Sequence, residues 1–263
     1  MRAIGIGAAM PTPRLVAFDL DDTLAPSKSP IDARIGALLL DLATRVEVAI
    51  ISGGQLQQFQ TQVVDRLPET DAATLDRFHL MPTCGTQYYR LRDGRTVTVY
   101  AHSLSADEKQ RALTAVEAEA RRLDLWEAEP WGDILEDRGS QITFSALGQF
   151  APLAAKTAWD PTGAKKNALR DAVAARLPDL EVRSGGSTSV DITHRGIDKA
   201  YGMHRLAEVT GIPLEDMLFV GDRLDEHGND YPVLALGVPC HAVDGWQDTA
   251  AFLDTLIPTL PAR

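Results

Sequence analysis

The segment Phe18-Asp19-Leu20-Asp21-Asp22-Thr23-Leu24 places three carboxylates directly after a short apolar run, residues 15–18. A short, bounded apolar run is typical of a buried strand. In an open α/β sheet, ligands bind outside the carboxyl ends of the strands. Crowded carboxylates repel one another unless a cation neutralises them, and a site made only of oxygen atoms suits Mg²⁺. The segment therefore predicts a cation site at a strand end, with a solvated acidic turn as the alternative.

Polar residues also follow two further apolar runs. Ser52-Gly53-Gly54 comes after residues 46–51 and before a predicted helix. A hydroxyl and backbone N–H groups at a helix start suit a phosphate oxygen, although the same tripeptide is also an ordinary turn. Asp222 follows the apolar run 217–220 and Gly221, and repeats the argument for a cation. Further carboxylates come shortly after it: Asp225, Glu226 and Asp230.

Lys199 lies near the start of another predicted helix. The helix dipole makes this an unfavourable place for a cation, so the position indicates an anionic partner. The alternative is that Lys199 is solvated, as most lysines are.

The composition excludes several classes of protein. The 263 residues carry a net charge of −11, which argues against a nucleic-acid-binding protein. No apolar run approaches the ~18–20 residues of a membrane span, and residues 1–13 read as a loose leader rather than a signal peptide. With only two cysteines, Cys84 and Cys240, a disulfide scaffold and a cysteine-rich zinc site are excluded. We expect a cytoplasmic protein with free thiols.

Apolar runs alternate with helical patterns, which predicts βαβ units around a parallel sheet. We therefore expect an α/β fold whose core is a doubly wound parallel-sheet domain made of residues 1–102 and 194–263. Residues 88–100 predict a hairpin with Asp93-Gly94 at its turn.

Residues 103–193 differ in pattern, and we expect them to fold as an inserted α+β domain. A charged, alanine-rich helix is predicted over residues 105–123, with Ser105 and Glu108 spaced as a capping box. Two segments of alternating polarity flank a second predicted helix and indicate a strand–helix–strand unit with one solvated sheet face. These three segments are residues 135–144, 164–177 and 181–192.

Four motifs resemble, in order and context, those of the haloacid dehalogenase superfamily of phosphotransferases. They are Asp19-Leu20-Asp21-Asp22-Thr23, Ser52, Lys199 and Gly221-Asp222. The resemblance implies that Asp19 is a nucleophile that forms an aspartyl-phosphate, and that Asp21 is the general acid and then the general base. A carboxylate can act as a nucleophile if cations screen the approach of two anions.

The same resemblance implies the binding roles. Ser52, with Gly53, and the catalytic Lys199 would hold the phosphoryl oxygens. Mg²⁺ would bridge Asp19, the backbone carbonyl of Asp21, and Asp222. Whether Asp225 or Asp230 joins this metal shell stays open.

The insertion lies between the Ser52 and Lys199 motifs, as in superfamily members with a large α/β cap. Three segments resemble eukaryotic-type phosphomannomutases: residues 136–149, 185–192 and 221–230. The resemblance implies that Arg138 grips a sugar phosphate or hydroxyl, and that Ser189 and Asp191 bind sugar hydroxyls. Arginine suits bidentate phosphate contacts, although a surface salt bridge is the alternative for Arg138. Asp191 could instead cap a strand end.

Two positions depart from the mutase pattern. Gln149 stands where the mutases carry a second arginine, and Lys28 stands where they carry an arginine shortly after the first motif. A mutase must bind a sugar bisphosphate in two orientations, so the loss of cationic contacts favours a hydrolase. Other cations could compensate: Lys165, Lys166 and Arg183.

We therefore expect a Mg²⁺-dependent phosphatase that hydrolyses a small hexose phosphate through an aspartyl-phosphate. The alternative is a hexose phosphomutase of the phosphomannomutase kind, and a non-enzymatic sugar-phosphate-binding protein is a third hypothesis. The expected partner is a small phosphorylated sugar, with no nucleic acid and no membrane. The protein is expected to be a monomer or a homodimer.

Overall fold

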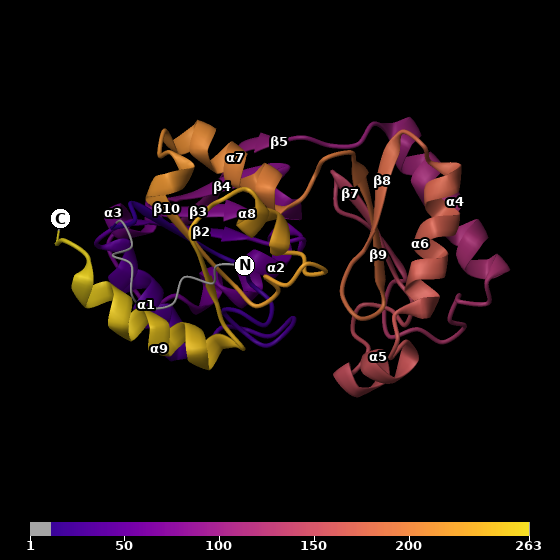
Figure 1. The fold of residues 1–263 in the computed structure, drawn as a ribbon, viewed down its shortest axis with the longest axis horizontal. Coiled ribbons are helices and arrows are strands. Elements are labelled where there is room, and N and C mark those ends of the chain that lie inside the picture. The colour runs from indigo at the N-terminus through magenta and orange to yellow at the C-terminus, as the bar shows by residue number, and fades with distance from the viewer. Residues whose placement is uncertain (1–11, 263) are drawn as a thin grey trace. The chain divides into compact units, whose positions relative to one another are not determined.

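The computed structural model describes residues 12–262, which fold into two compact units (Figure 1). Of the described residues, 12–101 and 198–262 form the core unit, and His102–Ile197 form the inserted unit. The inserted unit starts one residue before the expected limit at 103 and ends four residues after the expected limit at 193. The leader expected at residues 1–13 lies outside the described residues except for Thr12 and Pro13.

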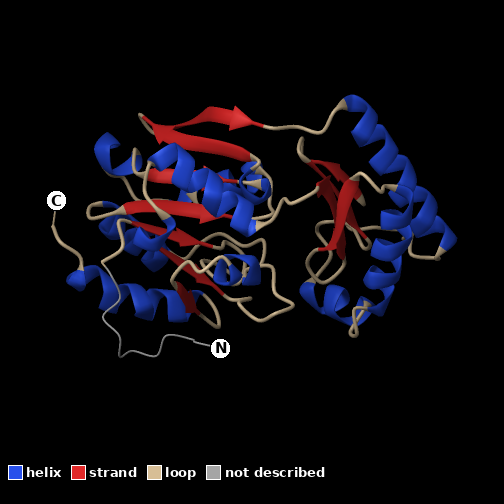
Figure 2. Ribbon diagram, turned by 45° about the horizontal axis from the view of Figure 1, so that its top comes forward, coloured by secondary structure: helices blue, strands red, loops and turns tan. Residues whose placement is uncertain are grey.

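The core unit is built on one seven-stranded sheet with the order β11-β10-β1-β2-β3-β4-β5 (Figure 2). Five strands are parallel: β1 (Leu15–Phe18), β2 (Glu47–Ile51), β3 (Phe78–Met81), β10 (Met217–Gly221) and β11 (Cys240–Ala242). The predicted hairpin forms the antiparallel edge, as β4 (Gln87–Arg92) and β5 (Arg95–Ala101). Phe18 pairs with Val220 on one side and Ile50 on the other, so the residues after β1, β2 and β10 meet at one edge.

Helices cover both faces of this sheet, which confirms the doubly wound α/β fold. On one face, α1 (Ala33–Ala43) and α9 (Trp246–Leu256) pack together over a core that includes Val16 and Phe18. On the other face, α7 (Lys199–Thr210) and α8 (Tyr231–Ala235) cover Leu15 and Ala17. Shorter helices lie in the connections: α2 (Leu56–Gln62), α3 (Ala72–Leu75) and 3₁₀ turns at Val64–Arg66, Thr83–Gly85 and Leu214–Asp216. A further 3₁₀ turn, Ile257–Thr259, follows α9.

The inserted unit is a four-stranded antiparallel sheet with the order β6-β7-β9-β8. Each segment predicted as one strand folds back as a hairpin, so the strand–helix–strand prediction was wrong. The strands are β6 (Leu135–Asp137), β7 (Gln141–Ser145), β8 (Leu180–Ser184) and β9 (Ser189–His194). The first hairpin turns at Gly139, whose φ of 83° favours glycine.

Both predicted helices are present, as α4 (Ala106–Arg122) and α6 (Ala164–Arg176), and they pack on one face of this smaller sheet. The capping box is present, because Ser105 Oγ accepts from the Glu108 N–H at 3.2 Å and Glu108 Oε2 accepts from the Ser105 N–H at 2.7 Å. Helix α5 (Leu153–Trp159) was not predicted. Apolar side chains such as Phe144 and Ile192 face the helices, so the residues that alternate with them form a polar sheet face.

A tight turn, Thr83–Gly85, follows β3 at the carboxyl edge of the core sheet. All three residues have positive φ, at 48°, 55° and 84°. The Cys84 N–H donates to Ser52 O at 2.9 Å, and the Thr83 N–H donates to Gly54 O at 3.0 Å. A Cβ on Gly85 would lie 2.7 Å from the Cα of Gly202 on α7. The turn therefore packs against both the Ser52 loop and the helix that begins at Lys199.

Within residues 12–262, none of the helices combines the length and the apolar character needed to cross a bilayer. Both cysteines, Cys84 and Cys240, are free thiols, as predicted.

The close approach at Gly85 predicts a large effect of one methyl group. Gly85→Ala should lower the free energy of unfolding by about 2–4 kcal/mol, because left-handed strain adds to overpacking. Gly211→Ala is the matched control, since Gly211 has a φ of 67° but open space around its Cβ position. Its cost should be about 1 kcal/mol, from strain alone. Urea unfolding of both variants checks this, and equal losses would contradict the role of the Gly85–Gly202 contact.

Candidate active site

A buried ion pair joins the first motif to helix α7. Asp19 follows β1, and its N–H donates to Val220 O on the neighbouring strand at 3.0 Å. Lys199 is the first residue of α7, which is capped by the Asp198 side chain. Lys199 Nζ lies 2.7 Å from Asp19 Oδ1 and also contacts Asp230. Lys199 is 1% exposed, Asp19 4% and Asp230 0%, so three charged groups share one desolvated site.

The electrostatics of this site favour a further cation. Burial raises the pKa of Asp19 to about 8, and Asp230 adds to the rise while Lys199 opposes it. Burial acts to lower the pKa of Lys199, but Asp19 and Asp230 outweigh it and keep that pKa above its usual range. Burial and the charge of Asp230 also raise the pKa of Asp222. A divalent ion would reverse these carboxyl shifts, because it favours the ionised form.

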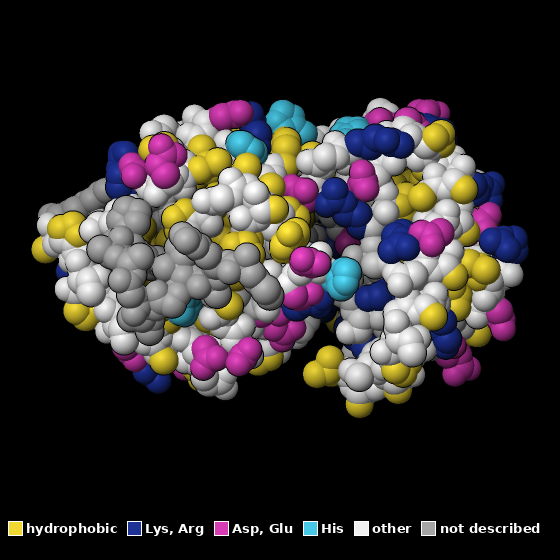
Figure 3. Space-filling model, in the orientation of Figure 1, with side chains coloured by type: hydrophobic (Ala, Val, Ile, Leu, Met, Phe, Trp, Pro, Cys, Tyr) yellow, Lys and Arg dark blue, Asp and Glu magenta, His cyan; other side chains and the backbone are white. Residues whose placement is uncertain are grey.

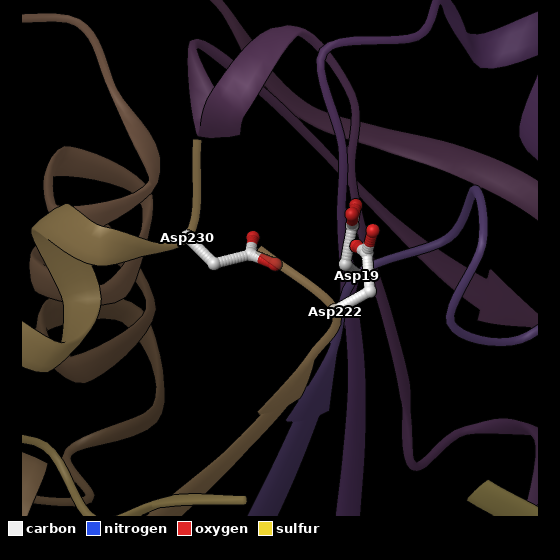
Figure 4. Close-up of side chains that lie close together, drawn as sticks. All are labelled: Asp19, Asp222 and Asp230. Carbon is white, nitrogen blue, oxygen red and sulfur yellow. The ribbon is translucent and has the colours of Figure 1, made fainter. Parts of the chain in front are cut away.

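Three carboxylates lie close enough to share such an ion. One oxygen each from Asp19, Asp222 and Asp230 fall within 4.8 Å of one another. Figure 4 shows the carboxyl groups of Asp19 and Asp222 side by side, with that of Asp230 directed toward them. These hard oxygen donors fit Mg²⁺. Gly221 leaves room for the group, because a Cβ there would lie 2.4 Å from Asp230 Oδ2.

The sequence left open whether Asp225 or Asp230 belongs to the metal site, and the structure distinguishes the two. Asp230 belongs to the cluster, and its Oδ2 also accepts from the Arg223 N–H at 3.1 Å. Asp225 instead pairs with Arg223 Nε at 3.0 Å. The carboxylate of Asp21 does not belong to this cluster and has hydrogen-bond partners of its own.

Asp21 is held in the loop that follows β1. Its Oδ1 accepts from the Lys28 N–H at 2.7 Å, and its Oδ2 accepts from Gln58 Nε2 at 2.9 Å. The loop is closed by the Asp22 N–H, which donates to Ala25 O at 2.7 Å, with Asp22 at a φ of 59°. Sequence reasoning identified Asp21 but missed Gln58, because a glutamine in a polar helix carries no signal of its own.

The predicted phosphate loop lies at the same sheet edge. Ser52 follows β2, is buried, and accepts at its Oγ from the Gly54 N–H at 3.2 Å. A Cβ on Gly53 would meet no atom within 4 Å, so a ligand could approach the backbone there. Because β1 and β2 are parallel neighbours in register, Ser52 and Asp19 leave the sheet side by side.

The second group of predicted residues lies on the polar sheet face of the inserted unit. Asp191 Oδ1 accepts from Gln141 Nε2 at 2.9 Å and from Thr143 Oγ1 at 2.7 Å. A Cβ on Gly185 would lie 2.6 Å from Asp191 Oδ2. Asp191 is thus fixed by a polar network across two strands, and sequence reasoning missed Gln141 and Thr143. Ser189 lies two residues earlier on β9, with its carbonyl accepting from the Gly185 N–H at 2.9 Å.

The cations of the inserted unit are distributed around these segments. Arg138 lies in the β6–β7 turn and pairs with Glu136, and Arg183 Nε lies 3.5 Å from Glu181. Lys166 Nζ donates to Gly186 O at 3.0 Å, while Lys165 Nζ lies 5.1 Å from the centre of the Trp159 ring. A further cation was missed: Lys156 Nζ donates to the carbonyl of Gln149 at 3.1 Å. On the face drawn in Figure 3, Lys and Arg side chains gather mainly over the inserted unit, whereas acidic side chains lie on both units.

Residues 35–259 match the family of eukaryotic phosphomannomutases. The chain belongs to this family. The matched range of the phosphomannomutase family contains Ser52, Arg138, Asp191, Lys199 and Asp222, and it begins after the Asp19 motif.

Two phosphomannomutases illustrate the likeness. Phosphomannomutase 1 of Mus musculus is 25% identical over 248 residues, which cover 89% of this chain and 88% of the mouse protein. The phosphomannomutase of Saccharomyces cerevisiae is 24% identical over 253 residues, which cover 92% and 93% of the two chains.

Solved structures share the fold. The IMP-bound, N-terminally truncated IMP-nucleotidase of Plasmodium falciparum superposes with a TM-score of 0.69 at 14% identity, covering 94% of this chain and 68% of that one. A haloacid dehalogenase-like hydrolase from Bacteroides thetaiotaomicron gives a TM-score of 0.62 at 14% identity, covering 93% and 99%. Together with the family match, these structures confirm that the chain is a haloacid dehalogenase superfamily enzyme resembling eukaryotic phosphomannomutase.

The carboxylate cluster predicts that Mg²⁺ stabilises the fold of this phosphomannomutase-family chain. At about 100 times its Kd, a ligand contributes about 2.7 kcal/mol, which should raise Tm by about 5–10 °C. Asp222→Ala should remove most of this increase, because a ligand oxygen is lost. Asp225→Ala should retain it, because Asp225 pairs with Arg223. Thermal unfolding with and without Mg²⁺ checks this, and the same shift in both variants would show that the cluster is not the binding site.

Proposed function

We propose that this enzyme transfers phosphoryl groups of hexose phosphates through an aspartyl-phosphate on Asp19, and that it acts as a hexose phosphomutase. The observation that carries the proposal is the buried Lys199–Asp19 pair beside the carboxylates of Asp222 and Asp230. A carboxylate in contact with a cation is oriented and screened for attack on a phosphate. The family match supports a hexose phosphate as the substrate.

The first half-reaction uses residues of the core unit. A carboxylate oxygen of Asp19 attacks one phosphorus of a hexose bisphosphate, and the bond from that phosphorus to the sugar oxygen breaks, which leaves a hexose monophosphate. Asp21 gives its proton to that sugar oxygen as it leaves. Ser52 Oγ, the Gly53 N–H and Lys199 Nζ donate hydrogen bonds to the phosphoryl oxygens. Asp19, Asp222 and the Asp21 carbonyl would hold Mg²⁺, and the ion would supply the charge neutralisation that lets two anions approach.

The second half-reaction returns the phosphoryl group to an acceptor. The acceptor oxygen attacks the phosphorus of the aspartyl-phosphate, Asp21 takes the proton of the acceptor, and Asp19 is regenerated. In a mutase the acceptor is a hydroxyl of the hexose monophosphate, so a hexose bisphosphate must turn over within the site. The inserted unit would act as the cap, with Arg138 on a phosphate or hydroxyl and Ser189 and Asp191 on sugar hydroxyls.

Lys156 supports the mutase over the hydrolase. Gln149 provides no charge at the position where the mutases carry a second arginine, but the ammonium group of Lys156 lies against its carbonyl. A cation at this place could hold the phosphate that is not reacting. A second candidate function is that of a hexose phosphatase, in which water is the acceptor. The neutral side chain of Gln149 is the observation that favours it.

The nucleophile is tested by Asp19→Asn, which replaces a carboxylate with an amide of the same shape. Phosphoryl transfer should fall by roughly 10³-fold or more, because the covalent route is lost. Asp225→Asn, a carboxylate outside the cluster, should keep near-normal turnover. Turnover of Asp19→Asn within tenfold of the wild type would contradict the assignment.

The acceptor is tested by measuring hexose phosphate interconversion and phosphate release together, with and without a hexose 1,6-bisphosphate. Interconversion should be faster than release. Lys156→Ala should lower interconversion by about 10–100-fold, the value of one charge-assisted hydrogen bond, with a smaller effect on release. Lys165→Ala is the matched control. Release that outpaces interconversion in the wild type would favour the phosphatase.

A further inference from the structure

Gln58 touches the proposed acid/base residue directly. Its Nε2 donates to Asp21 Oδ2 at 2.9 Å, while the Lys28 N–H donates to the other carboxylate oxygen at 2.7 Å. We propose that Gln58 is a positioning residue, whose side-chain amide fixes the carboxyl group of Asp21 for proton transfer. This inference rests on the proposed function, because it concerns the same half-reactions.

The side chain of Gln58 is itself held by its surroundings. Its Nε2 also donates to Oε1 of Gln62, one turn later on α2, at 3.1 Å, and Gln62 is only 3% exposed. A Cβ on Gly54 would lie 2.2 Å from Gln58 Oε1, so the glycine of the phosphate loop leaves room for this amide. The two hydrogen bonds from Nε2, together with the packing of Oε1 against Gly54, restrict the amide group to one orientation.

Helix α2 also anchors the loop that carries the second donor. The Ile31 N–H, just after that loop, donates to Gln62 O at 2.9 Å. Lys28, inside the loop, has a φ of 55° and offers its N–H to Asp21. Helix α2 therefore supports both hydrogen bonds to the Asp21 carboxylate. It supplies one through the side chain of Gln58, and it holds the loop that supplies the other through the hydrogen bond between Gln62 and Ile31.

Two contacts are needed because one does not fix a carboxyl group. Asp21 lies three residues beyond the end of β1, in a loop, so the sheet does not hold its side chain. With the Lys28 contact alone, the carboxyl group could turn about the Cβ–Cγ bond and still keep that hydrogen bond. Proton transfer requires a heavy-atom distance of about 2.6–3.2 Å to the reacting oxygen. The Gln58 contact removes the remaining rotation.

A positioning role for an acid has a specific kinetic signature. A sugar oxygen is a poor leaving group and needs the proton from Asp21 as its bond to phosphorus breaks. p-Nitrophenolate is a good leaving group and departs without that proton. Loss of Gln58 should therefore slow transfer from a hexose phosphate far more than transfer from p-nitrophenyl phosphate, whereas general damage to the site would slow both equally.

The experiment measures kcat and KM of the full chain with Mg²⁺ on a hexose phosphate supplied with a hexose 1,6-bisphosphate. It also measures the single-turnover release of p-nitrophenolate from p-nitrophenyl phosphate, which reports the first half-reaction alone. Gln58→Glu keeps the size of the side chain but replaces the donor with an acceptor, and Gln58→Ala removes the amide. Gln57→Ala, on the exposed side of the same helix, is the matched control. General acid–base catalysis contributes roughly 10²–10⁴-fold, so kcat for the hexose phosphate should fall by about 10–100-fold in both Gln58 variants. KM and the single-turnover rate of p-nitrophenolate release should change less than threefold.

The possible outcomes test the role of Gln58 separately from the proposed function on which that role rests. An active wild type, with Gln58 variants that match Gln57→Ala on both substrates, would overturn the positioning role alone. Equal losses on both substrates would also overturn it, because they indicate structural damage. A folded wild type that transfers no phosphoryl group from either substrate would overturn the proposed function and this inference with it. Thermal unfolding of each variant confirms that the two Gln58 variants are compared in the folded state.

Discussion

The buried contact of Lys199 with two carboxylates is the constraint around which the core unit is arranged. Asp19 comes from the end of β1, Asp230 from the loop after β10, and Lys199 from the start of α7, so the three groups tie three elements together. Removing one partner of a buried ion pair typically costs about 3–5 kcal/mol, because the other charge stays buried. Close packing supports the arrangement: Gly221 leaves room for Asp230, and Gly85 lets α7 approach the sheet edge.

The sequence predicted the residues whose place follows from the sheet itself. Asp19, Ser52 and Asp222 each come directly after a buried apolar run, and parallel strands bring such positions to one edge. Other residues reach the site through packing that no local pattern records. Asp230 joins the cluster because its loop folds back, with the Asp230 N–H donating to Arg223 O at 3.1 Å. Gln58 meets Asp21 across 37 positions, which periodicity cannot reveal.

The inserted unit was harder to predict because alternation of polarity does not show where a strand turns. Two long alternating segments became four strands, since Gly139 allows one reversal and the segment from Gly185 to Ser189 forms the other. Sequence reasoning missed one cation of the inserted unit for a related reason. Gln149 looks like a lost charge when the chain is read position by position, yet α5 brings Lys156 back to its carbonyl. The charge at a given place in the folded chain depends on which side chains reach it, and these can come from distant positions in the sequence.

The way the chain re-enters the core unit has a mechanical consequence. The inserted unit ends at Ile197, Asp198 caps α7, and Lys199 is already buried among carboxylates. The second of the two connections between the units is therefore clamped within two residues of its end. Because Lys199 is held in place, this connection cannot adjust at Lys199 itself. A change in the backbone torsions of this connection would therefore have to occur in the residues before Asp198. The lysine that contacts the proposed nucleophile therefore also fixes the chain at the point where it re-enters the core unit.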